Sequence, residues 1–320
     1  MGGGSSNNRS SVSSYYSSNA SYYSNVKRGD VERIYSPSIK PDMDPAQTKL
    51  PREACDSQEC PKSRGVVLIF DDTGSMDPIL TDLITKYLRR IAVEVPEAVT
   101  SYNPQILFGC INDIRAWCDT PLQIGQFEAG FDQMIDQIKS LHIQDGGGGN
   151  GSESYIIAHY FAAKHTRLES LEKHGEKGIF FMIGDDSPTP DLTQDERQKT
   201  FGKNDLGIPG VLTKEDVLEM LEEKYHVYQI VPHASNYDSY VARNWKNFLK
   251  GHALDIAEDE YIPDLVTAVL RMYDGKTKTE ALEMIDDSRA RSVVASAMED
   301  HEEIVEAQKW VDAAKGIEEF

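Results

Sequence analysis

The chain has 320 residues, of which 39% are hydrophobic, and its 33 basic against 53 acidic side chains give a formal net charge of −20. This length and hydrophobic content predict one principal domain with flanking segments. The negative charge repels phosphate backbones and anionic membrane surfaces, which argues against nucleic acid as a partner. The longest apolar run, residues 66–70, is far shorter than the roughly 20 residues of a membrane span, and the polar start has no signal-peptide core. We therefore expect a soluble, cytoplasmic protein.

The first 60 residues differ in composition from the rest of the chain. They begin with a stretch rich in Ser, Asn, Gly and Tyr that has almost no aliphatic side chains. Such a composition does not repay the entropy of ordering, so we predict a disordered tail over residues 1–60. The opening "MGGGSS" also fits the myristoylation pattern at Gly2, a match that a Gly/Ser-rich start produces easily by chance.

From Gly65 onward, strand and helix patterns alternate, which predicts an α/β domain over residues 61–275. We expect a doubly wound, mostly parallel six-stranded sheet, in which a hairpin turning at Asn112 and Asp113 adds one antiparallel edge strand. The expected elements in chain order are a strand at 65–70, a helix at 78–95, the hairpin within 105–124, helices at 127–141 and 152–172, a strand at 178–183, a polar excursion to 213, a helix at 214–225, a strand at 226–231, a helix at 240–249, a strand at 252–256 and a helix at 261–273. Residues 276–320 have the composition of an acidic helical extension that docks on the domain or on a partner.

The cysteines are few and have no metal-binding spacing. Cys55 and Cys60 lack a CxxC pattern and a nearby histidine, which argues against zinc. Cys110 and Cys118 could face each other across the hairpin, but buried free thiols are the more frequent case in a cytosolic chain. We assign no chemical role to the four cysteines.

Three oxygen-rich loops follow strands or precede a helix of the predicted sheet. They are "DDTGS" after the first strand, "GGGGNGS" before the helix at 152–172, and "GDDSP" after the strand at 178–183. In an open α/β sheet, ligands bind beyond the carboxyl ends of the strands, where these loops can meet. Since the loops contain neither His nor Cys, a hard cation such as Mg²⁺ or Mn²⁺ is the natural occupant.

These residues resemble the von Willebrand factor type A (VWA) domain, a Rossmann-like fold with a metal-ion-dependent adhesion site (MIDAS). "DDTGSM" is similar to the family's DxSxS motif, with Asp71, Thr73 and Ser75 as ligands and threonine in place of the first serine. "GGGGNGSES" resembles the Gly-rich loop that supplies a Thr or Ser, with Ser152 as first choice and Asn150 as the alternative. "MIGDDSP" is similar to the family's ITDGxP context, which makes Asp185 the third-loop ligand.

The resemblance implies a binding module rather than an enzyme. A cation held partly by neutral hydroxyls keeps one open position, which an Asp or Glu carboxylate of a partner protein fills. Intracellular members of the family work as adaptors or as subunits of ATPase-driven assemblies, so an AAA+ ATPase is one candidate partner.

An enzymatic alternative is a Mg²⁺-dependent phosphatase or hydrolase of the haloacid dehalogenase type. That family also places an aspartate at the end of an apolar strand, followed two positions later by an aspartate that acts as acid and base. Here Thr73 occupies the second position. Asp72 cannot replace it, because alternate residues of an extended segment point in opposite directions.

Overall fold

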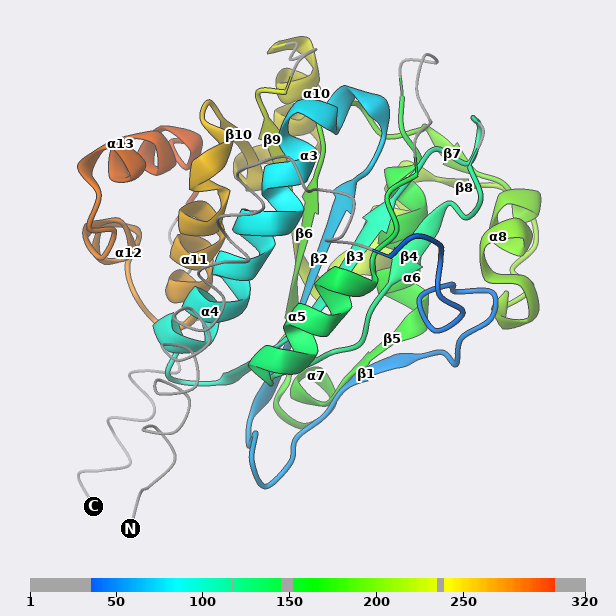
Figure 1. Ribbon diagram of the computed structural model, residues 1–320, viewed down its shortest axis with the longest axis horizontal. Coiled ribbons are helices and arrows are strands. Elements are labelled where there is room, and N and C mark those ends of the chain that lie inside the picture. Colours follow the sequence, from blue (N-terminus) through cyan, green and yellow to red (C-terminus); the bar gives the residue numbers. More distant parts are fainter. Residues whose placement is uncertain (1–35, 117, 145–151, 235–238, 303–320) are drawn as a thin grey trace.

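The computed structural model describes residues 36–116, 118–144, 152–234 and 239–302. Its centre is a six-stranded sheet of order β10-β9-β6-β2-β3-β4, in which only the β3–β4 pair is antiparallel. Helices cover both faces of the sheet (Figure 1). This confirms the predicted α/β class with a doubly wound, mostly parallel sheet and one antiparallel edge strand.

The bounds of the elements are as follows. The strands of the central sheet are β2 (Ser63–Asp71), β3 (Asn103–Ile111), β4 (Leu122–Ile124), β6 (Gly178–Ile183), β9 (Tyr225–Pro232) and β10 (Ala253–Ile256). The shorter strands are β1 (Arg52–Ala54), β5 (Thr166–Leu168), β7 (Asp191–Leu192) and β8 (Leu212–Thr213). The helices are α3 (Asp77–Asp82), α4 (Leu88–Ala98), α5 (Phe131–Ser140), α6 (Tyr155–His165), α7 (Glu169–His174), α8 (Gln194–Phe201), α9 (Lys214–Glu222), α10 (Ser239–Leu249), α11 (Ile262–Tyr273), α12 (Lys278–Glu283) and α13 (Ser288–Ala297).

The apolar run of β2 forms the middle of two cores. Val66, Leu68 and Phe70 face the core that α4, α5 and α11 complete, whereas Val67 and Ile69 face the core of α6, α9 and α10. Side chains alternate between the faces of a strand, so an unbroken apolar run fits a strand that is covered on both sides. Burying each of these side chains contributes roughly 1.5–3 kcal/mol. The carboxyl end of β2 is thereby held rigidly in the centre of the sheet.

The helix expected over 152–172 is interrupted. The structure has α6, then strand β5, then α7, because β5 pairs in parallel with β1, with Thr166 opposite Arg52. The Thr166 hydroxyl also donates to the Ala162 carbonyl at 2.6 Å and contacts the Tyr225 hydroxyl at 2.7 Å. The pairing with β1 and the contact with Tyr225 come from distant parts of the chain and outweigh the local helical pattern.

The expected hairpin is present with a longer connection than predicted. β3 and β4 pair antiparallel, with Cys110 opposite Gln123, but β4 starts only at Leu122. Asn112 and Asp113 therefore do not form a tight turn and instead lie in a loop at the carboxyl end of β3. All four cysteines are free thiols.

Residues 36–60 do not behave as the expected disordered tail. Met43 is 3% exposed in the main core, and its carbonyl accepts from the Ile124 amide at 2.9 Å. The Ser36 amide donates to the Leu141 carbonyl at 2.8 Å, and β1 lies beside β5. The composition of this segment hid these long-range pairings, while residues 1–35, including Gly2, lie outside the described part of the chain.

Truncation distinguishes the two halves of this N-terminal region. We expect deletion of residues 1–60 to lower the free energy of unfolding by at least about 2 kcal/mol, since it removes the buried Met43 and the partner of β5. Deletion of residues 1–35 is the matched control and should leave it unchanged. Urea denaturation of the three chains measures the difference, and equal stability of the two truncated chains would contradict the packing of this segment.

The first part of the acidic extension packs on the domain. Ala281 of α12 and Val294 of α13 are fully buried in the same core as α11, together with Ile285 and Met298. Residues 303–320 lie outside the described part.

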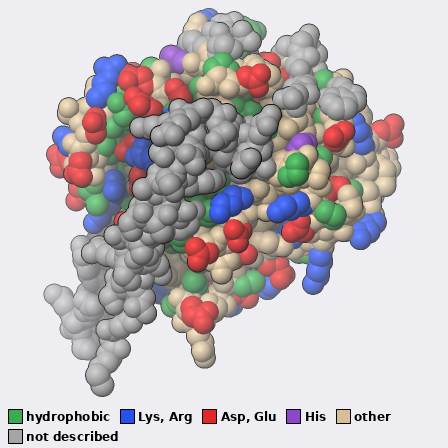
Figure 2. Space-filling view, in the orientation of Figure 1, with side chains coloured by type: hydrophobic (Ala, Val, Ile, Leu, Met, Phe, Trp, Pro, Cys, Tyr) green, Lys and Arg blue, Asp and Glu red, His purple; other side chains and the backbone are tan. Residues whose placement is uncertain are grey.

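None of the helices in the described ranges is both long enough and apolar enough to cross a bilayer. On the face shown in Figure 2, the coloured acidic and basic side chains are interspersed.

Candidate metal centre

The first loop begins where β2 ends, at the point where the order of the strands reverses. The chain passes from β2 to β3 on one side and later to β6 on the other, which makes the carboxyl ends of β2 and β6 the switch point where open α/β sheets bind their ligands. Asp71 is fully buried there, and its Oδ1 atom accepts from the Thr73 amide at 2.8 Å. This bond turns the chain so that the Thr73 Oγ1 and Ser75 Oγ atoms lie 3.4 Å apart.

The third loop meets the first directly. β6 lies beside β2 with Ile183 opposite Phe70, so the residues that follow both strands leave the sheet at the same level. The Ser75 hydroxyl donates to Asp185 Oδ1 at 2.8 Å. The other oxygen of this carboxylate, Oδ2, is buried without a hydrogen-bond partner. The structure thus brings together four of the five predicted ligands, Asp71, Thr73, Ser75 and Asp185.

The second loop joins the same edge through its backbone. The Glu153 amide donates to the Ser187 carbonyl at 2.8 Å, and the Glu153 carbonyl accepts from the Thr189 amide at 2.9 Å. Ser152, the predicted ligand, directly precedes this pairing and is half-buried. Asn150 and the four glycines before it lie outside the described residues. The choice between Asn150 and Ser152 therefore stays a prediction.

Glu153 is a site residue that the sequence reasoning missed. It is 3% exposed, and its Oε2 atom is buried without a hydrogen-bond partner. Burial, and next the charge of Asp71, raises the pKa of Glu153 to about 9. A glutamate two positions before the largely apolar stretch "YIIAHYFAA" was the available signal, because a carboxylate at the start of a buried helix needs a compensating group.

Tyr155 at the start of α6 fixes the carboxylate of Asp71. Its hydroxyl donates to Asp71 Oδ2 at 2.5 Å and accepts from the Asp186 amide at 3.3 Å. Tyr155 therefore links the first loop, the third loop and α6 through one buried oxygen. No local pattern indicates this role, because a tyrosine in an apolar helix is usually a core residue.

A supporting layer comes from the loop after β3. The Asn112 side-chain amide donates to Asp72 Oδ1 at 2.7 Å, and the Ser154 hydroxyl donates to Asp113 Oδ1 at 2.6 Å. Asp72 and Asp71 thus have different partners, which agrees with the expectation that adjacent carboxylates point apart. The long connection between β3 and β4 positions Asn112 and Asp113 for these contacts.

Gly184 allows the close approach of Tyr155 to the third loop. A Cβ atom at position 184 would lie 2.4 Å from the Tyr155 hydroxyl and 3.2 Å from the Asp71 Cβ. Both neighbours are buried, so neither can move away without disturbing the core.

We expect Gly184→Ala to lower the free energy of unfolding by about 1–3 kcal/mol, the usual cost of overpacking. Gly74→Ala is the matched control in the first loop, because a Cβ atom at Gly74 meets nothing within 4 Å. Chemical denaturation in EDTA measures both variants. A Gly184→Ala chain as stable as Gly74→Ala would contradict the described packing of Tyr155.

The electrostatics of the site are those of uncompensated buried carboxylates. Burial raises the pKa of Asp71 to about 7, with a smaller opposite effect from the Tyr155 hydroxyl. Burial likewise raises the pKa of Asp72 to about 8 and the pKa of Asp185 above its usual value. Several carboxyl groups that would be ionised in water are thus held in a region of low polarity, where a cation would stabilise their ionised forms.

The donor atoms fit a hard cation by chemistry. The part of the chain that the structure describes contains no group of three or more His, Cys, Asp or Glu side chains that could hold a metal by themselves. The convergent group differs in composition, since it combines the hydroxyls of Thr73 and Ser75 with the carboxylates of Asp71 and Asp185. Carboxylate and hydroxyl oxygens with water are the ligands that Mg²⁺ prefers, and the unpartnered Asp185 Oδ2 provides a buried atom that needs one.

Comparison with known proteins finds solved structures that are similar at low sequence identity. No family model matches the chain, and no curated protein does. Among solved structures, the pilus adhesin SpaC from Lactobacillus rhamnosus GG in its open conformation is similar over 76% of this chain and 31% of its own, with 11% identity and a TM-score of 0.44.

Two further solved structures are similar at the same low level of identity. A von Willebrand factor type A protein from Catenulispora acidiphila is similar over 74% of this chain and 43% of its own, with 11% identity and a TM-score of 0.34. The manganese-loaded TRAP protein of Plasmodium vivax is similar over 60% of this chain and 64% of its own, with 10% identity and a TM-score of 0.33. The chain thus spans less than two thirds of the length of each of these three structures.

Proposed function

We propose that this chain is a metal-dependent protein-interaction module of the VWA type with a MIDAS-like site. Asp71, Thr73, Ser75 and Asp185 hold Mg²⁺ or Mn²⁺, together with Ser152 or Asn150 of the second loop. The observation that carries the proposal is the 2.8 Å bond from the Ser75 hydroxyl to Asp185, which joins residues 110 positions apart at the sheet edge.

Glu153 adds a negative charge to this ligand set. Its buried, unpartnered Oε2 atom lies in the loop that pairs with the third loop, and burial, followed by the charges of Asp71 and other nearby carboxylates, raises its pKa. Groups that raise one another's pKa repel, and a shared dication relieves the repulsion. We therefore include Glu153 beside Ser152 as a candidate ligand from the second loop.

The bound cation supplies an open coordination position for an Asp or Glu carboxylate of a partner protein. Ser75 is half-buried and Gly74 is exposed, so the first loop reaches the surface where a partner can approach. Because the chain has a net charge of −20, most of its surface repels an acidic partner, and a bound cation would be a local point of attraction. A subunit of an AAA+ ATPase assembly is one candidate for such a partner.

The proposal is tested by affinity capture from an extract of the source cells with the full-length chain as bait. We expect a partner to be retained in Mn²⁺, to be released by EDTA and to be lost with Asp71→Ala and Ser75→Ala. Asp77→Asn is the matched control, since Asp77 is an exposed carboxylate two positions after Ser75. Retention that is equal in Mn²⁺ and in EDTA would contradict the proposal.

The phosphatase alternative has a different signature. Hydrolysis of para-nitrophenyl phosphate that persists in Thr73→Ala and is lost in Asp71→Asn would favour a nucleophilic aspartate. A binding module shows no turnover in either variant or in the wild type.

A further inference from the structure

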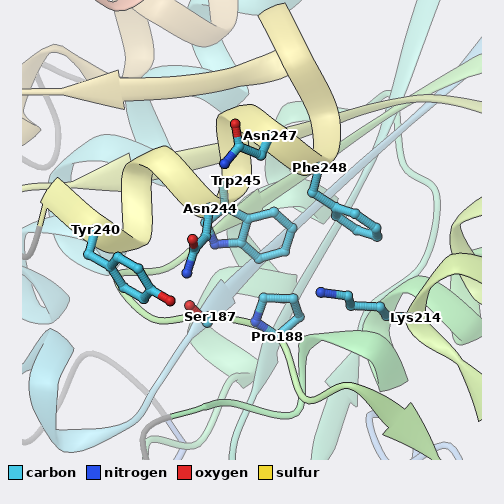
Figure 3. A pocket seen from close by; sticks show the side chains of 8 residues that line it. All are labelled: Ser187, Pro188, Lys214, Tyr240, Asn244, Trp245, Asn247 and Phe248. Atoms are coloured by element: carbon cyan, nitrogen blue, oxygen red, sulfur yellow. The ribbon is translucent and has the colours of Figure 1, made fainter.

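A cavity of about 420 Å³ lies beside the candidate metal centre, between α10 and the loop that follows β6 (Figure 3). This volume falls in the range of about 300–1,000 Å³ that is typical of ligand pockets. The labelled side chains of α10 line one wall, and Ser187 and Pro188 of the third loop line the opposite wall.

The cavity and the metal centre share a wall. The Trp245 Nε1 atom donates to the Asp186 carbonyl at 2.9 Å, and Asp186 lies between the predicted ligand Asp185 and the cavity residue Ser187. The Trp245 ring centroid is 6.2 Å from that of Tyr155, whose hydroxyl holds Asp71. Two residues of extended chain span about 7 Å. Since Asp185 and the cavity residue Ser187 are two positions apart, a peptide with a carboxylate at the metal would reach the cavity within about two or three residues.

The lining has the chemistry of a peptide site. Tyr240 and Phe248 offer aromatic surface, and Tyr240 is 59% exposed, whereas Trp245 is fully buried behind them. Asn244 and Asn247 lie on the same helix, and each amide carries donors and an acceptor that match the C=O and N–H groups of an extended backbone. A lining of apolar surface with a few polar groups suits an amphipathic segment.

Lys214 gives the cavity a positive charge. Its ammonium nitrogen lies 5.0 Å from the Phe248 ring centroid and 3.9 Å from the exposed Glu215 carboxylate. In Figure 3 this nitrogen points into the space between Phe248 and Pro188. On a chain with a net charge of −20, a cation beside the proposed metal favours an acidic ligand.

We propose that this cavity is the second subsite of the partner-binding surface, an inference that rests on the proposed function. It takes an aromatic or large aliphatic side chain of an acidic partner peptide, about two or three positions from the carboxylate that binds the metal. A second carboxylate of the same peptide pairs with Lys214. The cavity thus supplies the selectivity that a single carboxylate on a cation lacks.

The test uses displayed peptides with one fixed Asp flanked by random residues. The library is bound to the full-length chain in Mn²⁺ and eluted with EDTA, and a Gly/Ser peptide with a single Asp serves as reference. We expect enrichment of an aromatic or large aliphatic residue within about three positions of the fixed Asp, together with a second acid.

Variants then separate the cavity from the metal centre. We expect Lys214→Glu and Asn244→Ala each to weaken the selected peptide at least about tenfold, with the affinity for Mn²⁺ and for the reference peptide unchanged. Lys214 opens α9, where a glutamate is favoured, so the fold tolerates the change. Lys276→Glu is the control, because Lys276 is an exposed lysine at the opposite end of the sheet from the cavity. It lies just after α11, and the carbonyl of Tyr273, the last residue of α11, accepts from Arg64 near the amino-terminal end of β2.

The outcomes distinguish the two proposals. Peptides that elute with EDTA but bind equally to the wild type and to Lys214→Glu and Asn244→Ala would overturn the cavity assignment alone. Peptides that require Lys214 but resist EDTA would overturn the metal-dependent function. A chain without residues 1–35 is also compared with the full chain. If it binds the selected peptide more than about tenfold tighter, the N-terminal segment fills the cavity, and the assignment to a partner is overturned.

Discussion

Mn²⁺ or Mg²⁺ at 100 times its dissociation constant should stabilise the wild-type chain by about 2.7 kcal/mol, because a ligand that binds only the folded state shifts the equilibrium by mass action. For a chain of this size the corresponding rise in Tm is about 5–10 °C. Asp71→Ala should abolish the rise, since Asp71 is buried at the centre of the proposed ligand group. Thermal unfolding monitored by circular dichroism, with metal and with EDTA, measures it.

Controls make this result specific to the site. Asp77→Asn should keep the full metal response, because Asp77 is exposed and lies in the same stretch of chain. Asp71→Asn keeps the shape of the side chain and covers the case in which the alanine variant is too unstable. Glu153→Gln and Ser152→Ala, compared side by side, identify the ligand from the second loop. An unchanged metal response in Asp71→Ala would count against the assignment.

In EDTA, the free energy of unfolding should fall by a few kcal/mol between about pH 7 and pH 8.5. The pKa of Asp72 is raised to about 8 and that of Glu153 to about 9 in the folded chain, whereas both carboxyls are ionised above about pH 5 in the unfolded chain. The folded state thus holds more protons in this window, so each such proton lowers stability by about 1.4 kcal/mol per pH unit as the pH rises. Urea denaturation at fixed pH values gives the slope.

The chosen window separates the site from other titrating groups. Burial lowers the pKa of His159 and His165 to about 4, so these groups make stability rise with pH only up to about pH 6.5, where the unfolded histidines lose their protons. Thiols begin to titrate in the unfolded chain near pH 8.5. Glu153→Gln should reduce the slope and Asp77→Asn should not. Saturating Mn²⁺ should also reduce it, because a bound dication favours ionised carboxylates. A flat profile in EDTA would contradict the described burial of these carboxyls.

The central part of the fold follows from local patterns in the sequence. The apolar run of β2 predicts a strand covered on both faces, and polar residues directly after it and after β6 predict loops at one edge of a parallel sheet. For this reason Asp71, Ser75 and Asp185 could be placed together without coordinates. Their convergence depends only on the order of the strands, which alternating strand and helix patterns largely determine.

The rest depends on contacts between distant residues. Tyr155 looks like a core residue of α6, and only the neighbouring β2 and β6 loops give its hydroxyl a function. Thr166 breaks the expected helix because β1, more than 100 residues earlier, is available for pairing. A polar N-terminal segment with few aliphatic residues likewise gave no local signal that Met43 would reach the core. Local propensity cannot report pairings of this range.

The central claim is that oxygens from loops far apart in the chain hold one dication. A crystal of the full-length chain soaked in Mn²⁺, with anomalous diffraction data collected at the manganese absorption edge, tests it most directly. We expect one strong anomalous peak at about 2.0–2.4 Å from the oxygens of Ser75 and of at least one of Thr73, Asp71 and Asp185. A map without a peak between the β2 and β6 loops, or with manganese bound only elsewhere, would contradict the account.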